Sequence, residues 1–248
     1  MKVSRKLFAR AALLGSIAAG ASPAVALGAE DASIQEIAQG LQTTLDNVWI
    51  LVAAALVLFM QAGFSLVEAG MIRAKSVGNV MMKNLMDLCL GSLAFFAVGF
   101  AIAFGGDMTG IGKFIGGAGW FLGDGSFTYG NLTPFTFFVF QVAFAATAAT
   151  IVSGGMAERT KFKSYAVYSI VISALIYPVV VRWQWGGGWL YQLSTPFHDF
   201  AGSSIVHMTG GIAAFAGTKA LGPRIGKYGA DGKMKAIAAH SIPLVLTG

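Results

Sequence analysis

The sequence is poor in cysteine and in charge, and each scarcity excludes a class of protein. A single cysteine among 248 residues excludes a secreted module held together by disulfides. Only 11% of the residues are charged and 56% are hydrophobic, whereas a soluble domain carries about 25% charged residues. The composition therefore argues against a soluble protein of any fold. The formal net charge of +6 does not indicate a nucleic-acid binder either, because of where the charges lie.

The N-terminus has the pattern of a secretory signal peptide. Four basic residues within the first ten precede an apolar run over residues 11–21, and Ala24 and Ala26 fit the small-x-small rule for cleavage. The alternative is an uncleaved membrane helix, but the run is far shorter than the ~20 residues that a span needs. The residues after position 26 carry 13 basic and 11 acidic side chains, so most of the apparent basicity belongs to this peptide.

Five later stretches lack Asp, Glu, Lys and Arg for long enough to cross a bilayer, at ~1.5 Å of helix per residue. They are Asn47–Val67, Leu88–Gly106, Thr128–Ala157 (helical from about Pro134), Ser164–Val181 and Phe200–Thr218. A sixth apolar run opens at Ala236 and is too short for a span, so we expect the sequence to be the front part of a longer protein. We predict an all-α polytopic membrane protein, with a signal peptide at 1–26, an extracytoplasmic segment at 27–46 and a membrane domain at 47–248.

The basic residues between these stretches alternate between the two sides. The first, third and fifth connections hold 11 Lys and Arg, counting Lys83 beside the first, whereas the second and fourth hold only Lys113 and Arg182. By the positive-inside rule the odd connections are cytoplasmic and the mature N-terminus is outside. The signal peptide predicts the same orientation independently.

Aromatic side chains mark the third stretch and the end of the fourth. Phe140 and Phe144 are four residues apart and share a helix face, with the amide of Gln141 beside them, although ordinary packing is the alternative. Trp185 precedes three glycines, and their tight turn would let an indole lean over a pore mouth and attract a cation. Membrane anchoring is the ordinary role of such a tryptophan.

The fifth stretch begins with an acid and contains a histidine. Asp199 stands where a helix N-cap is expected, and His207 lies about two turns further on among small residues. A membrane histidine without an ionisable neighbour in its own span faces a protein interior or a polar pathway. His198 and His240 do not converge easily with His207, so no metal site is expected.

The remaining ionisable residues have plainer interpretations. Glu68 is expected to pair with Arg73 or Lys75, and Cys89 to be a buried, inert thiol. A solvated or capping edge of the second span is expected from four residues: Asn79, Lys83, Asn84 and Asp87. No phosphate loop, serine–histidine–acid set or metal-ligand spacing occurs in the sequence, so we expect neither an enzyme nor a cofactor.

Several motifs, taken in order along the chain, resemble the ammonium transporter family (Amt/Mep/Rh), and its Amt branch in particular. The motifs are Met60–Phe64, Glu68–Gly70, Arg73–Ser76, Lys83–Asn84 with Asp87, Ala101 with Phe104–Gly105, Phe140–Gln141 with Phe144, Gly154–Arg159, Trp185–Gly188, and Asp199–Gly202 with Val206–His207. Together they cover nearly all of residues 47–248. Arg182 departs from the family pattern, and we expect its side chain to point away to the lipid headgroups.

The resemblance implies a fold of eleven helices built from two inverted five-helix halves, of which this sequence resembles the first, in a homotrimer with one pore per subunit. Carried over residue by residue, the family's functional positions fall on one set of side chains: Trp185, Phe140 and Asp199 for cation recruitment at the outer mouth, Phe144 for the gate, and His207 and Gln141 for the pore. The implied partners are ammonium or ammonia, the lipid bilayer and, on the basic cytoplasmic loops, a PII-type regulatory protein, with no nucleic acid.

We therefore expect transport of ammonium or ammonia across the cytoplasmic membrane. Because an unpaired ion in hydrocarbon is costly, ammonium would be recruited as the cation, deprotonated near the gate and conducted as ammonia. An ammonium sensor with a C-terminal signalling domain is the main alternative. A redox or enzymatic membrane subunit with His198 or His207 as ligands is the second.

Overall fold

A computed structural model describes the backbone of residues 23–123 and 129–248, and the side chains of 33–123 and 129–248. The predicted signal peptide lies outside the described residues, apart from positions 23–26. The chain divides into two compact units, residues 1–49 and 50–248, which are treated separately. The described part of the first unit is helical and belongs to α2 (Pro23–Met71). This helix has no break at residue 47, where the sequence places the start of the membrane domain.

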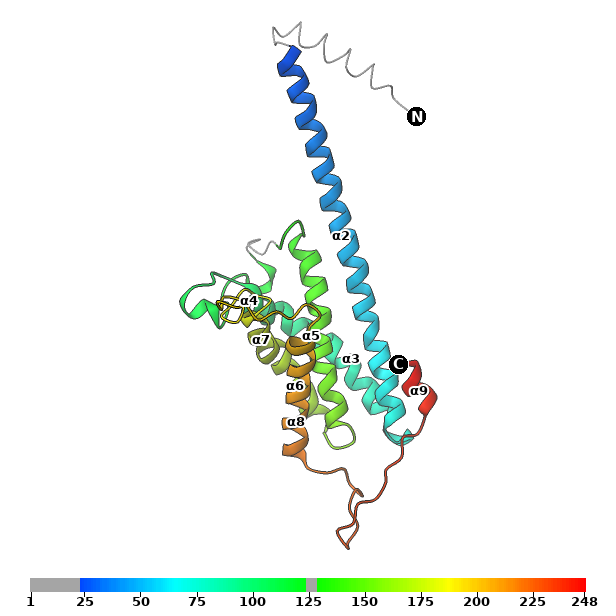
Figure 1. Cartoon of the computed structure of the whole chain (residues 1–248). Helices are drawn as coiled ribbons and strands as arrows, with labels where there is room; N and C mark the ends of the chain where they lie inside the picture. Colours follow the sequence, from blue (N-terminus) through cyan, green and yellow to red (C-terminus); the bar gives the residue numbers. More distant parts are fainter. Residues whose placement is uncertain (1–22, 124–128) are drawn as a thin grey trace. The chain divides into compact units, whose positions relative to one another are not determined.

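The second unit is a bundle of helices (Figure 1). Besides the C-terminal part of α2 it contains α3 (Val77–Ala94), α4 (Phe100–Phe104), α5 (Pro134–Met156), α6 (Phe162–Val171), α7 (Tyr177–Trp183), α8 (Thr209–Leu221) and α9 (Ile242–Thr247). Wider π-helical turns join them into longer rods: η2 (Phe95–Gly99) joins α3 to α4, η5 (Ile172–Ile176) joins α6 to α7, and η6 (Ser203–Met208) leads into α8. Short 3₁₀ turns lie in the connections: η1 (Ala74–Ser76), η3 (Gly110–Lys113) and η4 (Trp120–Leu122).

Four of the rods are long and apolar enough to cross a membrane: Ser33–Met71, Ala74–Phe104, Pro134–Met156 and Phe162–Trp183. The prediction of a mostly helical chain with apolar helices of membrane length is therefore confirmed. The predicted fifth span, Phe200–Thr218, is helical over residues 203–221 but is not among these four. The run that opens at Ala236 becomes helical only at Ile242, because Ser241 caps the helix there and Pro243 occupies its first turn.

Helix α5 forms much of the buried interior of the second unit. It begins where Thr133 accepts a hydrogen bond from the Thr136 N–H at 3.2 Å, and Pro134 fits the first turn because its missing N–H has no partner there in any case. Four alanines in the middle of α5 are fully buried: Ala145, Ala146, Ala148 and Ala149. Small side chains allow neighbouring helices to approach closely, as membrane bundles require.

A cluster of phenylalanine rings fills the space between α4, α5 and the π-turn η2. The ring centroids of Phe100 and Phe104 lie 5.1 Å apart, those of Phe104 and Phe137 4.8 Å apart, and those of Phe100 and Phe138 5.5 Å apart. The Phe104–Phe137 and Phe100–Phe138 pairs are edge-to-face, the arrangement that ring quadrupoles favour. This cluster fixes α5, and with it the face that carries Phe140 and Phe144.

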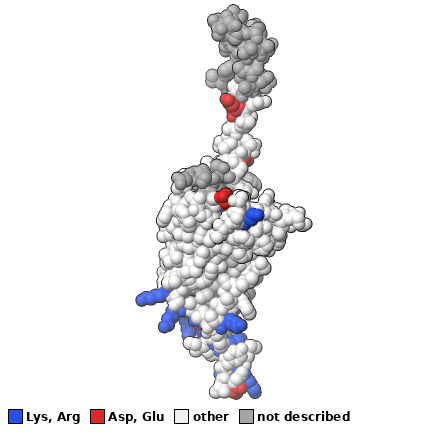
Figure 2. All heavy atoms as spheres, turned by 90° about the vertical axis from the view of Figure 1, so that its left-hand side faces the viewer, with Lys and Arg blue, Asp and Glu red and all other residues white. Residues whose placement is uncertain are grey.

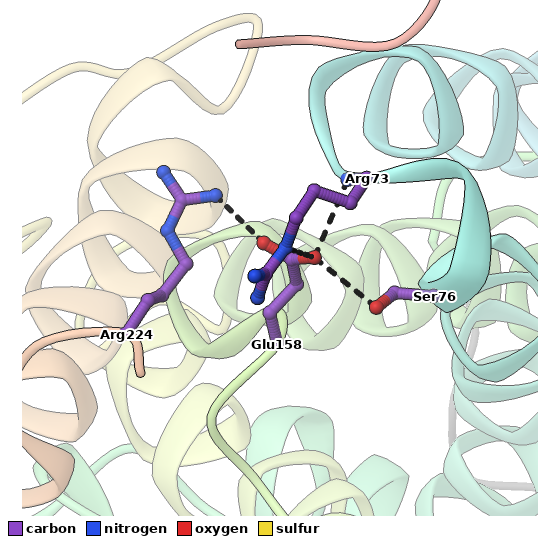
Figure 3. A network of polar contacts seen from close by, with 4 residues as sticks. All are labelled: Arg73, Ser76, Glu158 and Arg224. Atoms are coloured by element: carbon purple, nitrogen blue, oxygen red, sulfur yellow. Dashed lines mark hydrogen bonds and ion pairs between the residues drawn. The ribbon is translucent and has the colours of Figure 1, made fainter. Parts of the chain in front are cut away.

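The first, third and fifth connections meet at one end of the second unit through Glu158. Its Oε1 accepts from Arg73 Nε at 2.8 Å and from the Ser76 hydroxyl at 3.1 Å, and its Oε2 accepts from Arg224 Nη1 at 2.9 Å (Figure 3). Burial raises the pKa of Glu158, but the hydrogen bonds from both arginines and from Ser76 outweigh it and hold the pKa below its usual value. The backbone of Glu158 is in the left-handed region (φ +61°), a conformation that costs a non-glycine residue about 1–3 kcal/mol.

The second and fourth connections meet each other through Arg182. Its guanidinium donates to the Gly112 carbonyl at 2.7 Å and to the carbonyl of Asp107, and the side chain is fully buried. The expectation that Arg182 points to the headgroups is therefore wrong, because its Nε and Nη2 donate to carbonyls of the second connection inside the second unit. In the face shown in Figure 2, the blue of Lys and Arg is gathered mainly toward the lower end of the view, and some blue also lies beside red higher up. Odd and even connections thus join separately, as the alternation of charge predicts.

Three further sequence expectations are wrong. Glu68 does not pair with Arg73 or Lys75: it is buried and accepts from the Ser153 hydroxyl at 2.8 Å, while Arg73 binds Glu158. Cys89 is exposed rather than buried. The expected solvated edge of the second span is instead largely inside the bundle, where three of its members are buried: Lys83, Asn84 and Asp87. Of this set, Asp87 accepts hydrogen bonds from other helices, through the hydroxyls of Tyr165 and Thr150.

Adjacent glycines of α8 provide a test of its packing on α5. A Cβ on Gly210 would lie 2.8 Å from Ile151 Cβ and 2.9 Å from the Ala148 carbonyl oxygen, whereas a Cβ on Gly211 would meet nothing within 4 Å. We predict that Gly210→Ala lowers the stability of the full-length protein by about 1–3 kcal/mol through overpacking. Gly211→Ala is expected to be neutral or slightly stabilising, because alanine favours helix. Thermal unfolding in detergent compares the two, and equal effects would contradict the described packing.

Candidate functional site

The buried carboxylate of Asp199 organises one end of the second unit. Its Oδ1 accepts from the N–H groups of Gly202 at 2.9 Å and Ser203 at 3.1 Å. Its Oδ2 accepts from Ser204 at 2.8 Å and Ile205 at 2.9 Å. The first N–H groups of a helix have no partner within the helix, so Asp199 satisfies the start of η6. The carboxylate of Asp199 thus caps the helix as the sequence predicts, although the N-cap position itself is occupied by Gly202, three residues later.

The same hydrogen bonds set the protonation of Asp199. Burial raises the pKa of its carboxyl, but the four backbone N–H groups outweigh burial and hold the pKa below its usual value. The carboxylate is therefore ionised at neutral pH, and its lone pairs are directed at the helix start. This arrangement makes Asp199 a positioning residue for the turn that contains His207.

Asp199 also holds the indole of Trp185. The Trp185 Nε1–H donates to the backbone carbonyl of Asp199 at 2.7 Å. The ring lies against Gly202, where an added Cβ would come 3.0 Å from the indole Cη2. Gly202 has φ +90°, a region that favours glycine. Two independent constraints, the turn and the indole, thus require a glycine here.

Three aromatic rings from two segments form a continuous row. The centroids of Phe140 and Phe144 lie 4.9 Å apart with perpendicular planes, and those of Phe144 and Trp185 lie 5.5 Å apart at 65°. All three side chains are half-buried. The phenylalanines are placed by the helical spacing of α5, and Trp185 by the turn after α7, in which Gly187 has φ +72°. The row can therefore present π-faces to a cation.

The imidazole of His207 lies one helical turn beyond Gly202, and its side chain is exposed. Its Nδ1 lies 3.4 Å from the Gly202 carbonyl oxygen. A carbonyl oxygen only accepts, so this contact favours the proton on Nδ1 and leaves the lone pair on Nε2. His207 is thereby joined through Gly202 to both Asp199 and Trp185.

Gln141 does not join this row. Its side chain is buried, and its Oε1 has no hydrogen-bond partner among the described residues. Successive residues of a helix are about 100° apart, so Gln141 lies on a different face from Phe140.

No group of three His, Cys, Asp or Glu side chains suited to a metal ion is present in residues 33–123 and 129–248.

Comparison with known proteins decides the family. The model of the Ammonium Transporter Family matches residues 48–248. The chain belongs to the ammonium transporter family. It is 48% identical over 229 residues to the ammonium transporter Amt2 of Archaeoglobus fulgidus, covering 89% of this chain and 48% of that protein. It is 43% identical over 221 residues to Amt1 of Haloferax mediterranei, covering 86% and 41%.

Solved structures of the family share the fold. A structure described as a sensor Amt protein matches with a TM-score of 0.77 and 38% identity, covering 84% of this chain and 52% of that one. Mep2 of Candida albicans matches with a TM-score of 0.68 and 29% identity, covering 82% and 44%. The chain thus spans about half the length of the ammonium transporters that it matches. The family resemblance inferred from the motifs is confirmed, and the family consists of transporters rather than enzymes.

Some residues of this region could not be assigned from the sequence. Gly202 is an ordinary small residue in the motif, and only its positive φ and its contact with Trp185 show why it is needed. Arg182 interrupts the apolar pattern, but its role as a donor to the second connection depends on carbonyls about 70 residues earlier in the chain.

The depressed pKa of Asp199 predicts a pH dependence of stability. A carboxyl whose pKa is lower in the folded state stabilises the fold above its unfolded pKa of about 3.9 and loses this contribution as pH falls through the folded pKa. We predict that Asp199→Asn lowers stability at pH 7 by about 1–3 kcal/mol and flattens the acid side of the profile. Melting temperatures between pH 7 and pH 3 measure both effects. The exposed Asp231→Asn is the matched control, and a mutant profile parallel to wild type would contradict the role of the cap.

Proposed function

We propose that the protein carries ammonium or ammonia across the cytoplasmic membrane through a pore whose mouth is formed by Phe140, Phe144 and Trp185. Membership of the ammonium transporter family supports transport. One observation carries the assignment of the mouth: contacts run without interruption from Phe140 through Phe144 to Trp185, and on through Asp199 to the turn that holds His207.

Recruitment of the cation rests on the half-buried rings. An ammonium ion beside an aromatic face gains about 0.5–2 kcal/mol, which offsets part of the cost of losing water. Phe140 and Trp185 supply the recruiting faces, and Phe144, between them, is the gate. Asp199 contributes through its backbone and its cap, since its carboxylate oxygens already accept four N–H groups. It positions Trp185 rather than binding the cation directly.

Conduction beyond the gate requires the loss of a proton, because an unpaired ion in hydrocarbon is costly. Ammonium gives up a proton near the gate and passes as neutral ammonia. The Nε2 lone pair of His207 accepts a hydrogen bond from ammonia, whereas Gln141, on a different face of α5 from Phe140, is left out of this route. Potassium carries a charge that it cannot release, which makes the pore selective.

The proposal also covers the membrane orientation, the oligomeric state and the regulatory partner of this pore. The positive-inside rule places the basic end, with Arg73 and Arg224, in the cytoplasm and the aromatic mouth outside. The working unit is a homotrimer, and the basic loops are the surface for a PII-type regulatory protein. The predicted signal peptide and extracytoplasmic N-terminus agree with this orientation.

Substitutions of the rings and the imidazole test the transport route. We predict that Trp185→Leu slows uptake at low ammonium concentration by about 2- to 30-fold, the loss of one cation–π contact. His207→Ala is expected to slow transport about 5-fold or more, because a polar partner in the pore is lost. Uptake of methylammonium, or ammonium-dependent current, by the full-length protein in proteoliposomes measures both.

Trp49→Leu and His240→Ala are the matched controls, because both side chains are exposed and neither is among the residues proposed to form the pore. Both are expected to transport like wild type. Undiminished transport in the Trp185→Leu and His207→Ala variants would exclude the proposed roles of these residues.

Membrane orientation is tested by labelling of introduced thiols. In a Cys89→Ser background, we predict that Thr195→Cys in the fourth connection reacts with an impermeant maleimide added to intact cells, because this loop is outside. Lys233→Cys in the fifth connection is expected to react only after permeabilisation. The reverse pattern would invert the proposed topology.

A sensor is the second candidate function, because the matching structure at a TM-score of 0.77 is described as a sensor Amt protein. A sensor would bind ammonium at the same rings without net transport. Binding measured by calorimetry, together with the absence of uptake in proteoliposomes, would favour the sensor, whereas uptake that depends on Trp185 favours the transporter.

A further inference from the structure

A second set of polar side chains lies inside the second unit, between α2, α3, α5 and α6. Each member exposes at most 8% of its surface. The set comprises Gln61, Glu68, Lys83, Asn84, Asp87, Thr150, Ser153 and Tyr165. These residues belong to helices of membrane length. Ionisable residues within membrane spans are rare and commonly functional, and the transport route proposed above uses none of these.

Asp87 lies at the centre of the set. Its Oδ2 accepts from the Tyr165 hydroxyl at 2.6 Å and lies 3.4 Å from the Thr150 hydroxyl. Thr150 in turn donates to Gln61 Oε1 at 2.8 Å. The second acid, Glu68, accepts from the Ser153 hydroxyl at 2.8 Å. Hydroxyl groups from α5 and α6 thus hold two carboxyls from α2 and α3.

Lys83 is the only cation that interacts with both acids among the described residues of this set. Its ammonium lies 4.8 Å from the centroid of the Tyr165 ring and forms no direct ion pair with any described carboxylate. Four buried polar atoms have no protein partner among the described residues: Lys83 Nζ, Gln61 Nε2, Asp87 Oδ1 and Asn84 Oδ1. Two of them donate and two accept, so water, which does both, is the group that suits all four.

The formal charges of the set do not balance. One ammonium faces two carboxylates, which interact with it and with each other. The other titratable groups near Asp87 are the phenols of Tyr165 and Tyr168 on α6, and α5 contributes only hydroxyls. Two ionised acids would leave one uncompensated negative charge inside the membrane, which is unfavourable.

A proton balances this charge better than a metal cation does. A bound sodium or potassium ion needs several oxygen ligands, but only two fully buried acceptor atoms of this set, Asp87 Oδ1 and Asn84 Oδ1, lack a partner among the described residues. The ammonium of Lys83 would also repel such an ion. A proton needs one carboxylate oxygen. Water can bring it there from the end of the second unit at which the first, third and fifth connections meet, because Glu68 lies at that end, one turn before Ile72.

We propose that Glu68 and Asp87 share one exchangeable proton, with Lys83 as the fixed counter-charge and water as the bridge, in a site separate from His207. On uptake, an O–H bond forms at a carboxylate oxygen and an O–H bond of hydronium breaks, and on release the steps reverse. The site is a proton-binding site of the bundle, and its existence does not depend on whether the protein transports ammonium.

Infrared spectroscopy of the full-length protein in lipid tests the proposal. The wild type is expected to show the carbonyl stretch of a buried protonated carboxylic acid at pH 7, which shifts in deuterated water. Glu68→Gln and Asp87→Asn should each abolish it, because either variant leaves one carboxylate balanced by Lys83. Lys83→Met should strengthen it about 2-fold, since both acids must then be neutral. The exposed Glu36→Gln is the matched control and should leave it unchanged.

Absence of this stretch from the wild type would overturn the proposal. Its loss in only one of the two acid variants would also overturn it, because the proton would then belong to a single residue. If either acid variant fails to fold, as judged by size-exclusion elution, two other results decide. They are the shift of the wild-type carbonyl stretch in deuterated water and the strength of that stretch in Lys83→Met. The measurement needs no ammonium, so its outcome is independent of the transport assays.

Discussion

The site depends on one buried carboxylate that accepts four backbone N–H groups. The start of a helix leaves its first N–H groups without partners, and at a membrane surface such groups are expensive to leave unpaired. Asp199 satisfies them for η6, and its own carbonyl receives the indole N–H of Trp185. A single residue therefore fixes the position of the turn that carries His207 and the direction of the ring above it. The proposed recruitment of a cation beside Trp185 relies on this arrangement, although the four N–H groups already occupy the carboxylate oxygens.

Much of the fold could be predicted from where charge is missing. Four uncharged stretches correspond to the four helices of membrane length, because a bilayer admits long apolar helices and little else. The start of α5 at Pro134 and the shared face of Phe140 and Phe144 follow from local rules of capping and spacing. The capping of η6 by the Asp199 carboxylate is equally local. Sequence reasoning therefore finds the features that depend on residues close together in the chain, such as helix caps and shared helix faces.

The residues that sequence reasoning missed are those whose partners lie far away in the chain. Lys83 and Asp87 come just before an uncharged stretch, which suggests a solvated edge of the second span. Tyr165 and Thr150, which lie 78 and 63 positions further along the chain, nevertheless hold Asp87 inside the bundle. Arg182 donates to carbonyls about 70 residues before it. A pattern of charge along the chain shows where burial is costly, but it does not show which distant groups offset that cost.

The two π-turns η2 and η5 lie against each other, with Gly99 close to the Ser173 carbonyl and to Pro178. Pro178 has no N–H to donate, and the Tyr177 N–H just before it donates to the Ile172 carbonyl, the i→i−5 pattern of a π-turn. Each π-turn holds one residue more than a regular turn, and losing that residue would rotate everything beyond it by about 100°. Deleting one residue from η2 would therefore turn Phe104 away from Phe137, and deleting one from η5 would turn Arg182 away from the Gly112 carbonyl.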